Sequence, residues 1–259
     1  MHGVRPKKFL GQHFLKDKNI AQKIVDALSI KDDISVIEIG PGTGVLTEIL
    51  IERNFKKLVL IEIDRDSIAF LKENFADGRA MIFEGDFLKM DISNIVEQQF
   101  SIIGNFPYNI SSQIFFKVLE LRSQVNEIVC MIQKEVAQRI CSPPGNKTYG
   151  ILSVLLGAYF DTELLFKVPP GVFFPPPKVD SAVIRLTRNE RDSLSCDESL
   201  FAKIVKQGFQ NRRKTLRNAL KPIFLPEDLT QESVFDKRAE QLSVDDFIEL
   251  TRKIQTWKT

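Results

Sequence analysis

One stretch near the N-terminus constrains the fold more than any other. It is residues 34–44, Ile-Ser-Val-Ile-Glu-Ile-Gly-Pro-Gly-Thr-Gly. Its first half is apolar and β-branched, which predicts a buried strand. Val45, Leu46, Ile49 and Leu50 then recur at helical spacing. A glycine loop between a strand and a helix lets the backbone approach a ligand closely and presents free N–H groups to it. The pattern therefore predicts an α/β sheet with a nucleotide-type loop, although Gly-x-Gly-x-Gly differs from the dinucleotide fingerprint Gly-x-Gly-x-x-Gly.

Polar side chains follow three further apolar stretches that are predicted as strands. Glu62 and Asp64 lie at the end of residues 57–63, Asp86 follows residues 80–83, and Asn105 follows residues 100–104. The carboxyl ends of parallel strands meet at one edge of an open sheet, where ligands bind. Glu62, about 20 residues past the glycines, has the position of a carboxylate that accepts hydrogen bonds from ribose hydroxyls. Asp86 is a candidate acceptor for an adenine amine.

The tetrapeptide Asn105-Phe106-Pro107-Tyr108 places an amide, a backbone carbonyl and an aromatic ring within four positions. Pro107 fixes its own φ and favours an extended Phe106, so the Phe106 carbonyl and the Asn105 side chain can act as paired acceptors. Such a pair suits an exocyclic amine, and Tyr108 could cover the ring of an unstacked base. The alternative is an ordinary Asn-Pro turn after a strand. The polar strand ends upstream favour the binding site.

These motifs resemble those of S-adenosylmethionine-dependent adenine-N6 methyltransferases, and further motifs narrow the resemblance. They are residues 8–15 (Lys-Phe-Leu-Gly-Gln-His-Phe-Leu), 105–111, 133–135 (Gln-Lys-Glu), 175–182 (Pro-Pro-Pro-Lys-Val-Asp-Ser-Ala) and 210–215 (Gln-Asn-Arg-Arg-Lys-Thr). From about residue 7 to the C-terminus the chain resembles the ribosomal RNA adenine dimethyltransferase family, the KsgA-type enzymes of small-subunit ribosome maturation. The resemblance implies a Rossmann-like class I methyltransferase sheet, mostly parallel with an antiparallel edge hairpin, and a small C-terminal all-helical domain.

The resemblance also implies roles for individual residues. Gln12, His13 and Leu15 would hold the methionine end of S-adenosylmethionine, with Gly40 and Gly42 beneath it, Glu62 on the ribose and Asp86 on the adenine. Asn105 would also contact the cofactor. Asn105, Phe106, Pro107 and Tyr108 would bind the target base, and Phe173 would sandwich it against Tyr108, with Phe174 beside it. His13 stands where the family commonly has Asn. For Phe173 the alternative is a buried core ring, the usual place of Phe.

The implied reaction is dimethylation of N6 on two adjacent adenosines near the 3′ end of small-subunit (16S) ribosomal RNA. A large-subunit resistance methyltransferase would keep the same catalytic core, but residues 210–215 and the long C-terminal part favour the maturation enzyme. A noncatalytic assembly factor on the same fold is a further alternative. A nicotinamide oxidoreductase would leave residues 105–108 and the basic C-terminal stretch unexplained.

Basic residues gather in two stretches, although the net charge is only +2. The first includes Lys7 and Lys8, and the second runs from Lys203 to Lys221 without an acidic residue. Ile204, Gly208, Leu216 and Leu220 would form the inner face of a helix there. Lacking acids to pair with, these cations favour phosphate contacts. The expected RNA-binding residues are Lys7, Lys8, Lys178, Arg212, Arg213, Lys214 and Arg217.

A change of composition at residues 187–197 predicts a linker between a methyltransferase domain (residues 1–190) and a helical RNA-binding domain (residues 191–259). Before the linker, residues 162–168 and 182–186 are expected to pair as an antiparallel hairpin. The three cysteines form no CxxC pair, so a cytoplasmic location is expected, and neither a metal site nor a membrane span is predicted. The protein is expected to act as a monomer on the immature small subunit.

Overall fold

The computed structural model describes residues 4–29, 31–75 and 78–258, and the chain forms two compact units. The first unit is Met1–Ala137 with Thr162–Arg188, and the second is Gln138–Asp161 with Asn189–Thr259. The chain thus passes between the units close to the boundary expected at residue 190. It also passes at residues 137/138 and 161/162, so the second unit includes a segment that the sequence assigned to the first domain.

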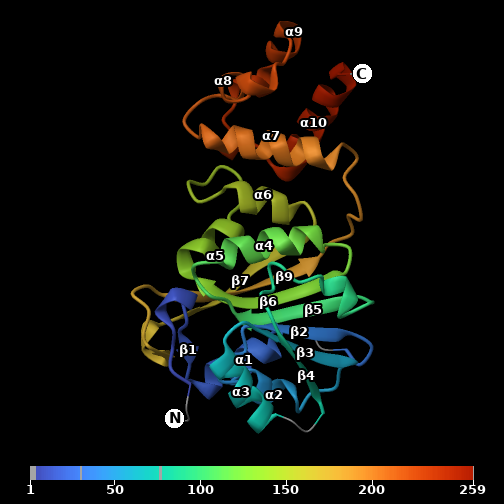
Figure 1. Ribbon diagram of the computed structural model, residues 1–259. Coiled ribbons are helices and arrows are strands. Elements are labelled where there is room, and N and C mark those ends of the chain that lie inside the picture. The colour runs from blue at the N-terminus through green and yellow to red at the C-terminus, as the bar shows by residue number, and fades with distance from the viewer. Residues whose placement is uncertain (1–3, 30, 76–77, 259) are drawn as a thin grey trace. The chain divides into compact units, whose positions relative to one another are not determined.

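A seven-stranded sheet forms the frame of the first unit, in the order β4-β3-β2-β5-β6-β9-β7 (Figure 1). Its strands are β2 (Ser35–Ile39), β3 (Lys57–Glu62), β4 (Ala80–Glu84), β5 (Phe100–Asn105), β6 (Val125–Gln133), β7 (Phe160–Val168) and β9 (Ser181–Arg188). Strands β2 to β6 run parallel, whereas β9 pairs antiparallel with β6 and neighbours β7 at the edge. The predicted sheet class is confirmed.

Helices and short segments complete the first unit. They are η1 (Lys8–Leu10), β1 (Phe14–Leu15), α1 (Lys18–Asp26), α2 (Thr47–Leu50), α3 (Arg65–Asn74), η2 (Ile92–Asn94), α4 (Ser111–Glu120), α5 (Lys134–Ile140, which continues into the second unit), η3 (Pro170–Val172) and β8 (Phe173–Phe174). Strand β2 is buried at all five positions, as expected for a parallel strand that is covered on both faces. On one face, Ile24 and Val25 of α1 belong to the same core cluster as Val36, Leu60 and Val129.

Local sequence signals explain where the helices begin. Asp17 caps α1 by accepting hydrogen bonds from the backbone N–H groups of Asn19 and Ile20, at 2.9 and 3.0 Å. Asp64 caps α3 in the same way, through the N–H of Asp66. These caps satisfy N–H groups that have no partner within the helix. Because α3 starts shortly after β3, the residue that caps α3, Asp64, also lies just beyond the end of the strand.

The strand register brings the polar strand ends to one edge of the sheet. Ile39 of β2 lies opposite Ile61 of β3, and Glu62 lies opposite Glu84 of β4. On the other side of β2, β5 runs on to Asn105. The glycine loop, Glu62 and Asn105 therefore leave neighbouring strands at the same edge, as the sequence predicted.

The second unit is helical apart from the first residues of β7. Its elements are α6 (Ile151–Gly157), α7 (Glu198–Gln210), α8 (Leu216–Ala219), η4 (Lys221–Ile223), α9 (Glu227–Thr230), η5 (Ser233–Asp236), η6 (Ala239–Gln241) and α10 (Val244–Lys258). The half-buried Phe209 ring contacts the buried rings of Tyr149 and Phe247, with centroid distances of 6.0 and 6.1 Å. Among the described residues, no helix combines the length and the apolar character needed to cross a membrane.

The basic stretch of residues 203–221 forms two helices, and the expectation of a single helix is wrong. The break lies at residues 211–215, where Thr215 is extended and forms an isolated β-bridge with Arg238. This long-range pairing overrides the helical periodicity of the sequence. The predicted inner face is nevertheless buried at all four positions, Ile204, Gly208, Leu216 and Leu220.

Candidate active site

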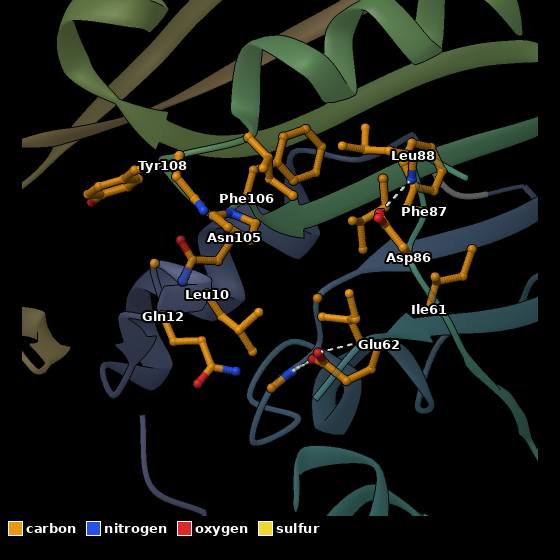
Figure 2. Close-up of a pocket in the computed structure, with 18 of the residues that line it drawn as sticks. Leu10, Gln12, Ile61, Glu62, Asp86, Phe87, Leu88, Asn105, Phe106 and Tyr108 are labelled. Carbon is orange, nitrogen blue, oxygen red and sulfur yellow. Dashed lines mark hydrogen bonds between the residues drawn. The ribbon is translucent and has the colours of Figure 1, made fainter. Parts of the chain in front are cut away.

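A pocket opens at the edge of the sheet where β2, β3, β4 and β5 end (Figure 2). The segments that follow these strands line it, together with residues 10–14 from the N-terminal segment. Figure 2 shows Ile61, Asp86, Phe87 and Leu88 on one side of the pocket, Gln12, Asn105 and Tyr108 on the other, and Glu62 between them in the lower half of the view. The pocket brings together most of the residues predicted from sequence: Gln12, His13, Gly40, Gly42, Glu62, Asp86 and residues 105–108.

The glycine loop after β2 forms one wall of the pocket. Gly40 and Gly42 have φ values of +67° and +57°, a region that residues with a side chain rarely adopt. A Cβ atom on Gly42 would lie 2.8 Å from the ring of Phe14. At Gly40 a Cβ would meet nothing closer than 4.0 Å, so hydrogen at this position keeps a backbone surface open for a ligand.

Glu62 is a buried carboxylate that is held by backbone donors. One oxygen accepts a hydrogen bond from Gly42 N (3.0 Å), and the other accepts from Ile63 N (2.8 Å) and Asp64 N (2.9 Å). Burial raises the pKa of Glu62, and these three hydrogen bonds oppose the rise. A carboxylate offers about four lone-pair sites, so Glu62 keeps capacity for a ligand hydroxyl while it holds the glycine loop in place.

Asp86 follows β4 and lies in the pocket beside apolar side chains. One of its oxygens accepts a hydrogen bond from Leu88 N at 3.0 Å, which orients the carboxylate. The other lies 3.8 Å from the Lys89 ammonium. Ile61 and Phe87 also line this part of the pocket. An apolar slot with one oriented carboxylate fits a flat heterocycle that carries an amine.

Asn105 is oriented by a hydrogen bond to the N-terminal segment. Its Nδ2 atom donates to the carbonyl oxygen of His13 at 2.8 Å, which leaves Oδ1 as the acceptor available in the pocket. The Phe106 ring is buried against Phe115, and Phe106 N donates to Met131 O at 3.0 Å. The Phe106 backbone is thus anchored to β6 directly after Asn105.

Tyr108 and His13 form an aromatic pair in the pocket. The two ring centroids are 5.3 Å apart, and the Tyr108 hydroxyl makes a hydrogen bond with the hydroxyl of Ser181. Burial raises the pKa of Tyr108, so the phenol stays neutral. His13 Nδ1 lies 2.7 Å from the carbonyl oxygen of Pro175 and must donate to it, since a carbonyl only accepts. The contact of His13 therefore ties residues 10–14 to Pro175, in the segment between β8 and β9.

Gln12 and Lys7 are largely occupied by protein contacts. Gln12 Oε1 accepts from Lys7 N (2.7 Å), and Gln12 Nε2 donates to Asp64 (3.0 Å). The Lys7 ammonium contacts Asp64 and also Asp66, the latter at 2.8 Å. Burial alone would raise the pKa of Asp64, but the hydrogen bonds from Lys7 and Gln12 lower it. Lys7, expected to bind RNA, instead fastens the N-terminal segment to the start of α3.

Two residues predicted for the site belong to the hydrophobic core. Leu15 is buried in the core cluster and does not line the pocket. Phe173 is 1% exposed in the same cluster, so no ring face remains open for a base. The pairing of β1 with β8 places Phe173 opposite Leu15 and Phe174 opposite Phe14. Because neighbouring side chains of a strand point to opposite faces, Phe174 is the exposed ring of this loop.

The predicted RNA-binding cations also divide into two groups. Lys8, Lys178, Arg213 and Lys214 are exposed. Arg212 instead pairs with Glu240 at 2.6 Å and donates to the carbonyl oxygen of Asn146 at 3.2 Å. Arg217 pairs with Asp236 at 2.7 Å. Arg212 and Arg217 therefore hold the second unit together, and the exposed group remains available for phosphates.

Three polar residues near the pocket were not assigned a role from sequence. Asp64 and Ser181 fix Gln12 and Tyr108, as described above. Glu38, in β2, is 1% exposed and accepts a hydrogen bond from Thr47 Oγ1 at 2.6 Å. Burial raises the pKa of Glu38 to about 8, and nearby Glu62 adds to the rise. The only signal in the sequence was an acidic residue within an apolar strand.

Comparisons with known proteins identify relatives along nearly the whole chain. A family model described as "Ribosomal RNA adenine dimethylase" matches residues 3–256. A protein from Flavobacterium johnsoniae is 55% identical over 256 residues, which are 98% of this chain and 98% of the relative. A protein from Parabacteroides distasonis is 54% identical over 253 residues, which are 97% of this chain and 94% of the relative. Both are named "Ribosomal RNA small subunit methyltransferase A".

Solved structures with the same fold include two RNA-modifying enzymes. A dimethyladenosine transferase from Plasmodium falciparum superposes with a TM-score of 0.81 and 28% identity, over 94% of this chain and 98% of that chain. The 23S rRNA methyltransferase ErmE superposes with a TM-score of 0.70 and 25% identity, over 92% of this chain and 99% of that chain. Both superpositions extend well beyond residue 190, into the helical part.

Proposed function

Because this chain belongs to the ribosomal RNA adenine dimethylase family, we propose that it dimethylates N6 of two adjacent adenosines in the 3′-terminal hairpin of small-subunit (16S) ribosomal RNA. The methyl donor in this proposal is S-adenosylmethionine. The observation on which the proposal depends is the position of the hydrogen-bonded Asn105 amide and the anchored Phe106 backbone in the same pocket as the glycine loop and two strand-end carboxylates.

The residues of the pocket fit an adenosyl cofactor. Gly40 presents open backbone, and Glu62 has lone-pair capacity for a ribose hydroxyl. Asp86 lies in an apolar slot that would accept an adenine and its amine. Gln12 and His13 border the Asn105 side of the pocket, where they would meet the methionine end. S-adenosylmethionine supplies a methyl group that is already activated by its positive sulfur, so the protein mainly has to orient the acceptor.

The acceptor pair would orient the target amine. The lone pair of adenine N6 is delocalised into the ring, which makes the amine a poor nucleophile. Asn105 Oδ1 and the Phe106 carbonyl oxygen would accept its two N–H groups and favour a more tetrahedral nitrogen, whose lone pair then points at the methyl group. The Tyr108 ring would cover the extruded base. The methylated nitrogen loses its proton readily to water, so the reaction does not require a basic side chain.

A second transfer to the same nitrogen needs one N–H acceptor and room for the first methyl group. After one transfer, N6 retains a single N–H, which either acceptor can bind. Neither acceptor belongs to a flexible side chain, because Asn105 is tied to His13 and the Phe106 backbone is tied to β6. A rigid pair of acceptors would therefore present the monomethylated amine in the same orientation as the unmethylated one.

Sequence identity favours the small-subunit substrate over the large-subunit one. The two relatives named for the small subunit are 54% and 55% identical, whereas the 23S rRNA enzyme is 25% identical. The two classes share the fold, so the fold alone does not discriminate between them. In this proposal the partner is the immature small subunit, the protein acts as a monomer, and the reaction takes place in the cytoplasm.

The test is to incubate immature small subunits with labelled S-adenosylmethionine and to identify the labelled nucleosides and their positions. We expect N6,N6-dimethyladenosine at two adjacent positions of the small-subunit RNA. Asn105→Ala should abolish transfer while cofactor binding, measured by calorimetry, persists. Asn94→Ala is the matched control, since Asn94 is exposed on η2. Monomethyladenosine alone, label in large-subunit RNA, or full activity of Asn105→Ala would contradict the proposal.

A further inference from the structure

Phe224 is the most exposed large apolar side chain among the described residues. It is 90% exposed and has a left-handed backbone, with φ +56°. It directly follows η4, and its N–H donates to the carbonyl oxygen of Lys221 at 3.0 Å. A bulky residue in this conformation is a genuine outlier, because its Cβ crowds the backbone. Two unfavourable features therefore coincide at one residue: exposure of an aromatic ring and backbone strain.

The neighbourhood of Phe224 is well anchored. Leu220 and Ile223 on one side and Leu229 on the other are buried. Pro222 and Pro226 restrict the backbone on both sides of the ring. The loop is thus fixed at both ends, and the ring stands out from a rigid support. Strained residues on over-determined supports are typical of functional sites.

The charge of the segment that leads to Phe224 favours a nucleic acid as the partner. Lys221 is exposed in the same 3-10 turn, and Arg213 and Lys214 are exposed in the turn before α8. No acidic residue occurs between Lys203 and Lys221; Glu227 and Asp228 follow only in the first turn of α9. A projecting aromatic ring on a segment with exposed cations is the usual combination for binding unpaired nucleotides.

A protein partner would require a different surface. Protein-binding patches are contiguous and have an apolar centre. In the described part of the second unit, the other exposed large apolar side chain is Trp257, which lies on α10 and not in this loop. A single exposed ring offers a stacking platform for one base and little apolar area for a protein.

We infer that Phe224 stacks against an unpaired base of the bound RNA, while Lys221 and the exposed Arg213 and Lys214 contact phosphates of the same RNA. The inference rests on the proposed function, because that function supplies the RNA. It adds a contact made by the second unit, whereas the residues of the methyl-transfer pocket belong to the first unit. Phe224 would act in RNA binding and not in methyl transfer itself.

The experiment compares Phe224→Ala, Phe224→Gly and Phe224→Trp by fluorescence anisotropy with a fluorescein-labelled single-stranded RNA dodecamer, and by methylation of immature small subunits. Loss of the ring should weaken dodecamer binding about 5- to 150-fold, the range of one base–aromatic stack. It should raise KM for subunits by a similar factor with kcat unchanged. Trp should retain affinity because it keeps a flat ring. Trp257→Ala is the matched control, another exposed ring of the second unit, and should behave as wild type.

Two further measurements separate stacking from a structural role. Phe224→Gly should raise the melting temperature, because glycine adopts positive φ without strain, and yet weaken RNA binding. The slope of log affinity against log salt should stay unchanged in Phe224→Ala and fall by about 1 in Lys214→Ala, since stacking releases no counterions.

The outcomes distinguish this inference from the proposed function. If wild type methylates small subunits and Phe224→Ala equals it in both KM and dodecamer affinity, the inference is wrong and the proposed function stands. If Phe224→Ala weakens the dodecamer while wild type fails to methylate subunits, the proposed function is wrong and the RNA contact stands. A fall in the melting temperature of Phe224→Gly that parallels its loss of affinity would overturn the inference, because the residue would then be structural.

Discussion

Replacement of Glu38 by Gln should change how the stability of the protein depends on pH. Glu38 is 1% exposed, and its carboxyl group accepts a hydrogen bond from Thr47. Burial raises its pKa from 4.5 to about 8. At a pH between these two pKa values, the folded protein keeps the proton on Glu38, whereas the unfolded chain releases it. Unfolding therefore releases a proton in this window, and the free energy of unfolding falls as the pH rises from about 4.5 to about 8.

The expected magnitude follows from the size of the pKa shift. Each pH unit within the window changes the free energy of unfolding by about 1.4 kcal/mol, and the whole window amounts to about 5 kcal/mol. Gln has nearly the same shape, can accept the Thr47 hydrogen bond and does not titrate. The stability of Glu38→Gln relative to wild type should therefore increase by about 3 kcal/mol between pH 5.5 and 7.5.

The assay is urea unfolding followed by circular dichroism at pH 5.5, 6.5, 7.5 and 8.5, on wild type and Glu38→Gln. Other titrating groups are common to both proteins, so they cancel in the difference. Glu97→Gln is the control, since Glu97 is exposed. Its difference from wild type should be small at every pH. A difference between Glu38→Gln and wild type that stays constant from pH 5.5 to 8.5 would refute the reasoning, since Glu38 would then ionise normally.

Two further substitutions test the packing of the site and the role of an ion pair. Gly104→Ala would place a Cβ atom 2.6 Å from the carbonyl oxygen of Ile39, a backbone atom that cannot move aside. The free energy of unfolding should therefore fall by about 1–3 kcal/mol, and single-turnover methyl transfer should slow. An unchanged free energy of unfolding and an unchanged transfer rate would contradict this packing. Arg212→Ala should lower the melting temperature and leave the salt slope of RNA binding unchanged, since Arg212 is already paired. Lys214→Ala should leave the melting temperature unchanged and reduce the salt slope of RNA binding. Equal salt slopes in the two variants would rule out this division of roles.

The sequence alone was sufficient to predict the sheet and to place most of the pocket residues at one edge of it. Buried β-branched runs predict parallel strands, and a polar residue at each strand end predicts a site at one edge, because both signals are local in the chain. For this reason Gly40, Glu62, Asp86 and Asn105 lie together in the structure. The position of Asn105 at a strand end also follows from its short-range context, although the hydrogen bond from Asn105 to the His13 carbonyl that orients its side chain spans 92 residues.

Tertiary structure decided what local patterns leave open. Phe173 and Phe174 are neighbours with the same side chain, and only the pairing of β8 with β1 determines which of them enters the core. Lys7 and Arg212 have the composition of RNA-binding cations, but Asp64 and Glu240, distant in sequence, neutralise them in the fold. In the same way, the segment 138–161 joins the second unit through contacts with residues beyond 188. Each of these outcomes depends on side chains far apart along the chain, and a pattern within one segment carries no information about its partner in space.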